Sequence, residues 1–171
     1  MRGYVQLYTG KGKGKTTASF GLTVRALGAG LDVYMIQFMK GRKDSAFGVL
    51  DEVENFDCDI FGKKGIRGKD NLLDEDYELA EEGLDKAMEV LERGEVDVLV
   101  LEEINVALEY GLIGKGDILD LIDNKPEEIE IVMTGRYAPE KLIEASDLVT
   151  EMKKVKHYFD GGTKAREGID Y

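Results

Sequence analysis

A glycine- and lysine-rich segment, TGKGKGKTT at residues 9–17, is the strongest constraint on how this chain folds. It follows an apolar run typical of a β-strand at residues 4–8 and leads into an amphipathic helical run at residues 16–30. A strand, a glycine-rich turn and a helix N-terminus form an anion site, because free backbone N–H groups and the positive helix end face the same place. A solvated hairpin tip is the alternative, but the order of the elements favours a phosphate-binding loop.

This loop departs from the usual pattern G-x-x-x-x-G-K-[ST], because Thr9 stands where the pattern has its first glycine. The three remaining glycines would let the backbone approach phosphates closely. Lys15 is the expected catalytic cation, and the hydroxyl of Thr16 is suited to bind Mg²⁺. The other two lysines could equally be solvated charge. The residues predicted to bind phosphates are Gly10, Lys11, Gly12, Lys13, Gly14, Lys15, Thr16 and Thr17.

The rest of the chain alternates short apolar runs with amphipathic helical runs, which predicts a parallel sheet covered by helices. Strands are expected at residues 4–8, 32–39, 55–61, 96–101, 129–133 and 148–155. Helices are expected at residues 16–30, 47–53, 74–93, 105–112, 116–123 and 139–145, with a glycine- and lysine-rich loop at residues 62–71. A length of 171 residues suits one domain, so we predict a single α/β domain over residues 1–171.

Composition narrows the partners and the cellular setting. The net charge of −12 disfavours long-range attraction to nucleic acid or to an anionic membrane. No apolar run approaches the roughly 18 residues of a membrane helix, and the first strand begins too early for a signal peptide, so we expect a cytoplasmic protein. One cysteine and one histidine exclude an intramolecular disulfide and a histidine-rich metal site. We interpret Cys58 as a small core residue and His157 as a hydrogen-bonded structural residue.

Two adjacent acids, Glu102 and Glu103, directly follow the apolar run at residues 96–101. A phosphate-binding loop needs an acidic partner for its metal at the end of a neighbouring buried strand. We expect one of the two carboxylates to reach Mg²⁺ or its water and the other to orient a loop. A mere surface position is the alternative, and the usual residue here is the shorter Asp.

Three further side chains are expected at the same edge of the sheet as the loop. Phe38 and Lys40 follow the second strand, and Arg136 follows the fifth. Because an open parallel sheet binds its ligand at the carboxyl ends of its strands, these are candidate substrate contacts. Phe38 could equally lie in the core, and Arg136 could be an ordinary surface arginine.

Two short matches to guanine-nucleotide motifs point elsewhere. Residues 59–62 fit D-x-x-G, and residues 124–127, NKPE, approach the guanine-reading N-K-x-D. The second match ends in Glu and follows an amphipathic helical run instead of a strand, so Asn-Lys-Pro reads as a helix stop. We therefore do not favour a GTPase.

Taken together, five segments resemble the P-loop type of ATP:corrinoid adenosyltransferase. They are TGKGKGKTTASFG, QFMKG, LVLEEINVALEYGLI, VMTGRYAP and KHYFDGGTKAREGIDY, in the same order from the first strand to the last residue. The altered loop of that family has the form G-x-G-K-G-K-T-T, which Gly10 to Thr17 match, so Thr9 is a family trait. The resemblance implies a RecA-like fold, a mostly parallel sheet with helices on both faces, commonly in a homodimer.

The resemblance also implies a reaction. The substrates would be ATP with a divalent metal, Mg²⁺ or Mn²⁺, and a cobalt corrinoid reduced to Co(I) by an electron donor. Cobalt would attack the ribose C5′ and displace the whole triphosphate, with the nucleotide held in the reverse of the usual sense. Lysines and loop N–H groups suit a departing triphosphate, and such chemistry needs no general base. An NTPase or phosphotransferase with conventional nucleotide orientation, and a non-enzymatic ATP-responsive corrinoid carrier, are the alternatives.

By position, Thr16 and Glu103 match the metal-binding threonine and acidic residue of the family, with Glu102 beside them as the weaker candidate. This chain differs in two features from several members of the family. Those members carry an N-terminal extension that helps cover the corrinoid, and they have a Phe-x-Trp segment after the third strand that helps keep the cobalt without a lower ligand. This chain has no tryptophan, and Phe61 is the aromatic residue at that place.

Overall fold

The apolar runs of the sequence become the strands of one sheet, and the central strands are buried on both faces as in other parallel sheets. The computed structural model describes residues 2–63 and 68–171. Its strands are β1 (Val5–Thr9), β2 (Val33–Phe38), β3 (Phe56–Phe61), β4 (Val98–Glu102), β5 (Glu130–Thr134) and β6 (Leu148–Glu151). They lie in the order β3-β2-β4-β5-β1-β6, and every neighbouring pair is parallel. The predicted α/β fold is confirmed and is consistent with a RecA-like P-loop fold.

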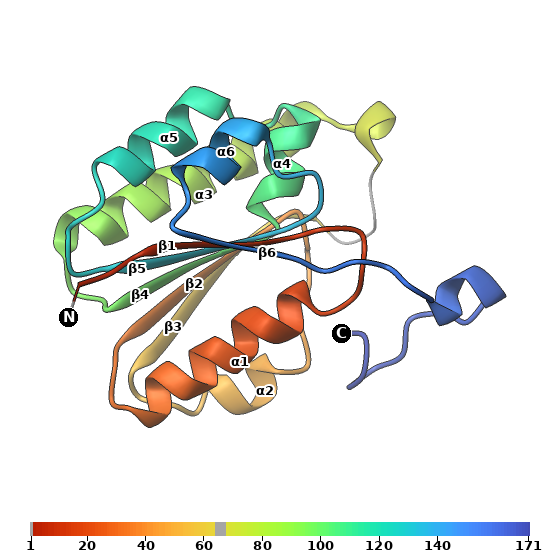
Figure 1. The fold of residues 1–171 in the computed structure, drawn as a ribbon, viewed down its shortest axis with the longest axis horizontal. Helices are drawn as coiled ribbons and strands as arrows, with labels where there is room; N and C mark the ends of the chain where they lie inside the picture. Colours follow the sequence, from red (N-terminus) through yellow and green to blue (C-terminus); the bar gives the residue numbers. More distant parts are fainter. Residues whose placement is uncertain (1, 64–67) are drawn as a thin grey trace.

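Helices cover both faces of the sheet, as Figure 1 shows. Helices α1 and α2 lie on one face, and α3 to α6 lie on the other. The bounds are α1 (Lys15–Gly28), α2 (Phe47–Leu50), α3 (Asp74–Arg93), α4 (Ile104–Tyr110), α5 (Lys115–Asp123) and α6 (Glu140–Ala145), with short 3₁₀ turns η1 (Lys69–Asn71) and η2 (Tyr158–Gly161). Each face has its own cluster of buried apolar side chains.

Helix α3 spans the predicted residues 74–93, and capping interactions at both of its ends explain this agreement. The carboxylate of Asp76 accepts a hydrogen bond from the backbone N–H of Leu73 at 2.8 Å, which satisfies one donor that the helix start leaves unpaired. The helix ends before Gly94, which adopts a left-handed φ of 64°. On the inner face, a Cβ at Gly83 would lie 2.7 Å from a ring carbon of Phe38, so glycine lets the helix pack this close to the sheet.

Strand β6 is shorter than predicted. The expected strand runs to residue 155, but β6 ends at Glu151, which pairs with Thr9, the last residue of its neighbour β1. Beyond this pair β1 turns into the glycine-rich loop and offers no further ladder. Residues 152–171, here called the C-terminal segment, therefore leave the sheet and extend beyond it (Figure 1). Part of the predicted loop at residues 62–71, namely residues 64–67, lies outside the described residues.

Candidate functional site

The carboxyl ends of four parallel strands place the predicted site residues at one edge of the sheet. Strand β1 leads into the glycine-rich loop at residues 10–14, β2 into residues 39–46, β4 into Glu103 and β5 into residues 135–138. Strand β5 lies between β1 and β4, so the loop and the two acids come from strands that are not neighbours. The sequence-based placement of all four segments at a common edge is confirmed.

The glycine-rich loop curls around the ammonium group of Lys15. Gly10 and Gly14 have φ values of 100° and 121°, a region that glycine enters without steric cost. Lys15 is 8% exposed and donates hydrogen bonds to the carbonyl oxygens of Gly10 at 2.8 Å and Gly12 at 2.7 Å. Burial lowers the pKa of Lys15 below its ordinary value, and the nearby Glu103 partly offsets this effect. A cation is thus fixed at the start of helix α1.

Gly12 makes a contact that no motif in the sequence indicates. Its backbone N–H donates to the carbonyl oxygen of Met152 at 2.6 Å, where the C-terminal segment leaves strand β6. A Cβ at Gly12 would lie 2.6 Å from that same oxygen. The expectation that the loop N–H groups point together at phosphates therefore needs a correction, because in this structure the N–H of Gly12 holds the chain beyond β6.

Glu102 is the polar centre of the site. Its side chain is 0% exposed and accepts hydrogen bonds from three hydroxyl groups. Thr16 donates to Oε1 at 2.5 Å, while Ser19 and Thr134 lie 2.9 and 2.7 Å from Oε2. The first two hydroxyls come from helix α1 and the third from the end of β5. A buried carboxylate is tolerated when hydrogen bonds surround it in this way.

Thr16 contacts Glu102, the acid that the resemblance offers as the weaker metal candidate. The hydroxyl of Thr16 donates its hydrogen bond to the carboxylate of Glu102, and metal binding by Thr16 and Glu103 stays a prediction. Glu103 adopts a left-handed conformation with φ of 62°, which turns the chain into helix α4, and its N–H donates to the hydroxyl of Thr134 at 3.0 Å. Burial raises the pKa of the Glu103 carboxyl above its usual range.

Lys40 forms ion pairs with both Glu102 and Glu103, at the edge of the sheet where the sequence predicts it. Its ammonium nitrogen lies 3.7 Å from Oε1 of Glu102 and 3.8 Å from Oε1 of Glu103. Met39, directly before it, has a positive φ of 63°, an uncommon conformation for a residue with a side chain. The backbone thus turns sharply after β2 at the residue that precedes this cation.

The other candidate substrate contacts are Phe38, Phe61 and Arg136, and they differ in burial. Phe38 is 0% exposed and packs in the core, so we correct its assignment as a substrate contact: its side chain points to helix α3 instead of the open edge. Phe61 is partly buried against the same cluster. Arg136 is exposed, and the described residues give it no ion-pair partner. It follows Gly135, whose carbonyl accepts a hydrogen bond from the buried Asn105 at 3.1 Å.

His157 and Cys58, expected to be structural residues, lie away from the glycine-rich loop in sequence. His157 accepts a hydrogen bond at Nδ1 from the backbone N–H of Phe159 at 3.1 Å, which confirms its interpretation as a hydrogen-bonded residue. Cys58 is partly buried against the α1–α2 face of the sheet and not fully inside the core. Burial raises the pKa of the Cys58 thiol, which suits an unreactive side chain.

Two further features, a cluster of metal-binding side chains and a membrane-spanning helix, are absent from the part of the chain that the structure describes. Residues 2–63 and 68–171 contain no group of three or more His, Cys, Asp or Glu side chains arranged to hold a metal ion. Within the same residues, no helix is both long and apolar enough to cross a membrane.

The chain is similar to a known protein family and to several named proteins. The model of the family described as ATP:corrinoid adenosyltransferase BtuR/CobO/CobP matches residues 1–171. Relatives named corrinoid adenosyltransferase include proteins from Sinorhizobium sp. (35% identity), Pseudomonas aeruginosa (34%) and Escherichia coli K12 (31%). Each alignment covers 99% of this chain and 81%, 84% and 86% of the respective relative. The chain belongs to the ATP:corrinoid adenosyltransferase family.

The guanine-nucleotide match at residues 124–127 lies at the end of a helix, away from the glycine-rich loop. Asn124 follows the last residue of helix α5, and the ammonium of Lys125 donates to the carbonyls of Gly3, Pro126 and Ile129 at 2.8–3.1 Å. These carbonyls lie before β1 and β5, at the edge of the sheet opposite the loop. In this adenosyltransferase, Asn124 and Lys125 end a helix and do not read a base.

Several residues of the adenosyltransferase site were not predicted from the sequence. Ser19 is one helical turn beyond Thr16, and that spacing could have indicated a second hydroxyl on the same helix face. Thr134 ends strand β5 directly before Gly135, a position at the same edge. Lys13 has its partners, Tyr158 and Asp170, in the C-terminal segment, more than 140 residues along the chain. No local signal in the sequence indicates that last contact.

Proposed function

We propose that the carboxyl edge of the sheet binds ATP and transfers its 5′-deoxyadenosyl group to the Co(I) centre of a reduced corrinoid. The observation that carries this proposal is the placement of Lys15 and the Thr16–Glu102 pair at the start of helix α1, in a chain whose full length matches the family. In the reaction, a cobalt lone pair forms the Co–C5′ bond. The C5′–O bond breaks, and triphosphate leaves with its electron pair.

The loop would act on the leaving group. Lys15 lies at a buried position, where a charge acts more strongly than in water, and it would balance negative charge that grows on the departing triphosphate. To do so, its ammonium exchanges its bonds to the carbonyls of Gly10 and Gly12 for phosphate oxygens. No side chain has to remove a proton, since the nucleophile is a metal-centred lone pair.

The acidic residues suit a divalent cation bound with the nucleotide. Mg²⁺ prefers oxygen ligands and is usually held by one or two carboxylates together with substrate phosphates. The hydroxyl of Thr16 and the carboxylate of Glu102, 2.5 Å apart, with Glu103 beside them, form such a donor set and would hold Mg²⁺ or Mn²⁺. When bound, the cation would supply further charge neutralisation to the triphosphate. Lys40 balances the two acids from the opposite loop.

The corrinoid would approach from the exposed side of the same edge. Arg136 is exposed and without an ion-pair partner among the described residues, which suits a contact to an anionic or amide-bearing substrate. Phe61 remains the aromatic candidate near the reacting cobalt, because it ends β3 at this edge.

The test is anaerobic incubation of the protein with ATP, Mg²⁺ and chemically reduced cobalamin. Formation of the Co–C bond is followed by absorbance, and the released phosphate species are identified by ³¹P NMR. We expect adenosylated corrinoid and triphosphate in equal amounts, and no phosphate release when the corrinoid is omitted. Phosphate or a phosphorylated product without adenosylated corrinoid would indicate an NTPase or phosphotransferase. Corrinoid binding without turnover would indicate a carrier.

A further inference from the structure

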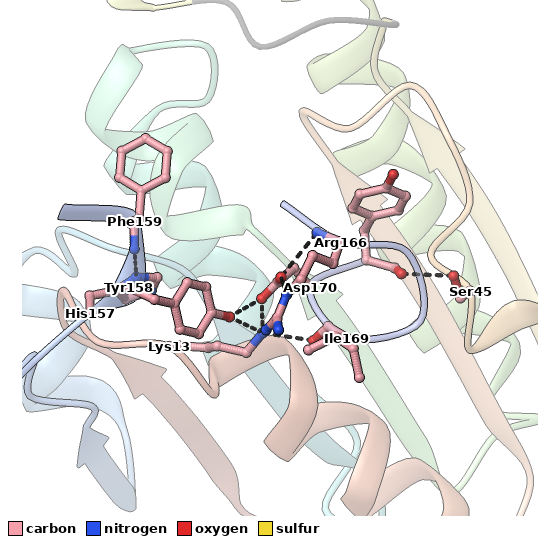
Figure 2. Close-up of polar contacts among 9 residues, drawn as sticks. Lys13, Ser45, His157, Tyr158, Phe159, Arg166, Ile169 and Asp170 are labelled. Carbon is pink, nitrogen blue, oxygen red and sulfur yellow. Dashed lines mark hydrogen bonds and ion pairs between the residues drawn. The ribbon is translucent and has the colours of Figure 1, made fainter. Parts of the chain in front are cut away.

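The C-terminal segment returns to the site after leaving strand β6. It runs outward through η2 and comes back so that its last residues lie beside helix α1 (Figure 1). Figure 2 shows its polar contacts with two loops of the carboxyl edge. The first contact is with Lys13 of the glycine-rich loop, and the second is with the loop after β2, at Arg42 and Ser45.

Lys13 is fully engaged by the C-terminal segment. Its ammonium donates to the hydroxyl of Tyr158 at 3.0 Å, to the carbonyl of Ile169 at 2.7 Å and to the carboxylate of Asp170 (Figure 2). A lysine ammonium has three hydrogens, so these three acceptors use its whole donor capacity. Lys13 therefore fixes the position of the loop relative to the segment, whereas Lys15 remains the cation inside the loop.

Asp170 is the centre of this contact. It accepts hydrogen bonds from Lys13, from the hydroxyl of Tyr158, and from the backbone N–H and Nε of Arg166 at 3.0 and 3.1 Å. The hydrogen bond from Lys13 is the main reason that the pKa of Asp170 lies well below its usual range. Lys13 and Arg166 both contact this carboxylate, so two cations balance its negative charge. A balanced carboxylate is compatible with a place beside a phosphate site.

Tyr171, the next residue, holds the second loop. The guanidinium carbon of Arg42 lies 3.3 Å from the centre of the Tyr171 ring, a stacked cation–π arrangement. The hydroxyl of Ser45 donates to the backbone oxygen of Tyr171 at 2.7 Å. The carbonyl of Arg42 also accepts a hydrogen bond at 3.0 Å from the buried Gln37 of β2. This loop carries Lys40, the cation that contacts both acids of the site.

We propose that Asp170 and Tyr171 are positioning residues that join the glycine-rich loop to the loop after β2 and hold both in the arrangement that binds the nucleotide. The proposal rests on the proposed function of this edge. Two consecutive residues act through different partners, Asp170 through Lys13 and Tyr171 through Arg42, so each contact can be removed separately. Fixing the two loops before ATP arrives lowers the ordering that binding would otherwise require.

The test measures ATP binding by calorimetry with Mg²⁺ and without corrinoid, in the full-length protein. Asp170→Asn is expected to weaken ATP binding about tenfold, as for residues coupled through direct contact, and Asp170→Glu to restore part of the loss. In the double-mutant cycle, Lys13→Met combined with Asp170→Asn should be no weaker than Lys13→Met alone. Additive losses would show that the two residues act independently and would overturn the proposal. Tighter ATP binding by Asp170→Asn would overturn it too, because the carboxylate would then compete with phosphate.

Substitutions of Tyr171 test the second contact independently of Asp170. Tyr171→Leu removes the ring under Arg42 and should weaken ATP binding, whereas Tyr171→Phe keeps the ring and should bind as the natural protein does. Asp160→Asn is the matched control, since Asp160 is exposed on the same segment and pairs with Lys154 at 2.8 Å. In turnover, KM for ATP should rise in the Asp170 and Tyr171→Leu variants with kcat little changed. An unchanged KM with a lowered kcat would overturn the proposal.

These outcomes are separable from failure of the proposed function. If the natural protein binds ATP but forms no adenosylated corrinoid, the proposed function fails while the binding cycle still tests Asp170 and Tyr171. If adenosyl transfer occurs and the variants bind ATP normally, the positioning role fails and the function stands. Circular dichroism and the unfolding midpoint of each variant establish that it is folded before its affinity is compared.

Discussion

The hydroxyl of Thr16 and the carboxylate of Glu102 lie 2.5 Å apart, although they come from opposite sides of strand β5 in the sheet order. Thr16 is in the first turn of helix α1, which follows β1, and Glu102 ends β4. Helix α1 therefore crosses the sheet so that its N-terminus reaches the acidic strand. This one hydrogen bond connects the glycine-rich loop with the acids and makes a single site of two distant segments.

The first prediction concerns the buried carboxylate. Glu102→Ala should lower the free energy of unfolding by about 2–4 kcal/mol, because three hydroxyl groups lose a buried acceptor and a cavity remains. It should also abolish adenosyl transfer, since the acidic partner of Thr16 is gone. Urea unfolding and the anaerobic absorbance assay measure the two effects.

Glu103→Ala is the matched control for stability. The Glu103 side chain is 22% exposed and pairs with Lys40 at 3.8 Å, so its removal should cost less, about 1 kcal/mol. The rate of adenosyl transfer by Glu103→Ala shows which acid the reaction needs: Glu103, which matches the family position, or Glu102, which accepts the hydrogen bond of Thr16. Equal destabilisation by the two substitutions would contradict the central place given to Glu102.

The second prediction concerns Lys15. Lys15→Met should reduce the rate of adenosyl transfer by at least about 10²-fold, as expected when a group that stabilises developing charge is removed. Lys141→Met is the control, because Lys141 is an exposed lysine of helix α6, away from the loop. Single-turnover assays at saturating ATP measure the effect. Transfer at an undiminished rate by Lys15→Met would remove the glycine-rich loop from the mechanism.

The third prediction is a pH dependence that results from the burial of Lys15. Burial lowers the pKa of this ammonium below the ordinary 10.5, so it loses its proton at a lower pH than an exposed lysine does. ATP affinity should therefore decline with rising pH before that ordinary value is reached. Calorimetric titrations of ATP over an alkaline pH series measure this decline.

Lys15→Arg provides the comparison for this pH series. Arginine keeps its charge throughout the range, so the alkaline loss of ATP affinity should be much smaller in this variant, whatever its affinity at neutral pH. The sign for stability is the reverse: the folded chain releases the Lys15 proton before the unfolded chain does, so stability gains with pH across that interval. The same alkaline decline in both proteins would assign the titration to another group.

The sequence predicted the sheet and the edge of the site because those depend on local patterns. Apolar runs mark buried strands, and the residues directly after a parallel strand must emerge at its carboxyl end, so the loop, Lys40, the two acids and Arg136 were placed correctly. Phe38 was not resolved in this way. A residue at the end of β2 can lie either in the core or at the open edge. Helix α3 packs closely against the Phe38 ring at Gly83, so this side chain is buried in the core.

Other features depend on contacts that local patterns do not contain. Glu102 and Glu103 are adjacent, and which of them faces helix α1 is settled by the left-handed turn at Glu103. The end of β6 depends on where its neighbour β1 stops, a matter of register between strands far apart in the chain. The contact of Lys13 with Asp170 spans 157 positions, so it depends on the path of the C-terminal segment and on no motif.

The last prediction concerns the close approach of the loop to the chain beyond β6. Gly12→Ala should destabilise the protein by at least about 2 kcal/mol, because the new Cβ would lie 2.6 Å from the carbonyl oxygen of Met152, a backbone atom that cannot rotate away. Gly21→Ala is the matched control: Gly21 is in the exposed part of helix α1 with nothing within 4 Å of a new Cβ, and alanine there should stabilise by about 0.5–1 kcal/mol. Urea unfolding of both variants measures the difference, and ATP binding should weaken in Gly12→Ala alone. Effects of the same sign and size in the two variants would mean that the loop tolerates a side chain at Gly12, and that its contact with Met152 does not hold the site together.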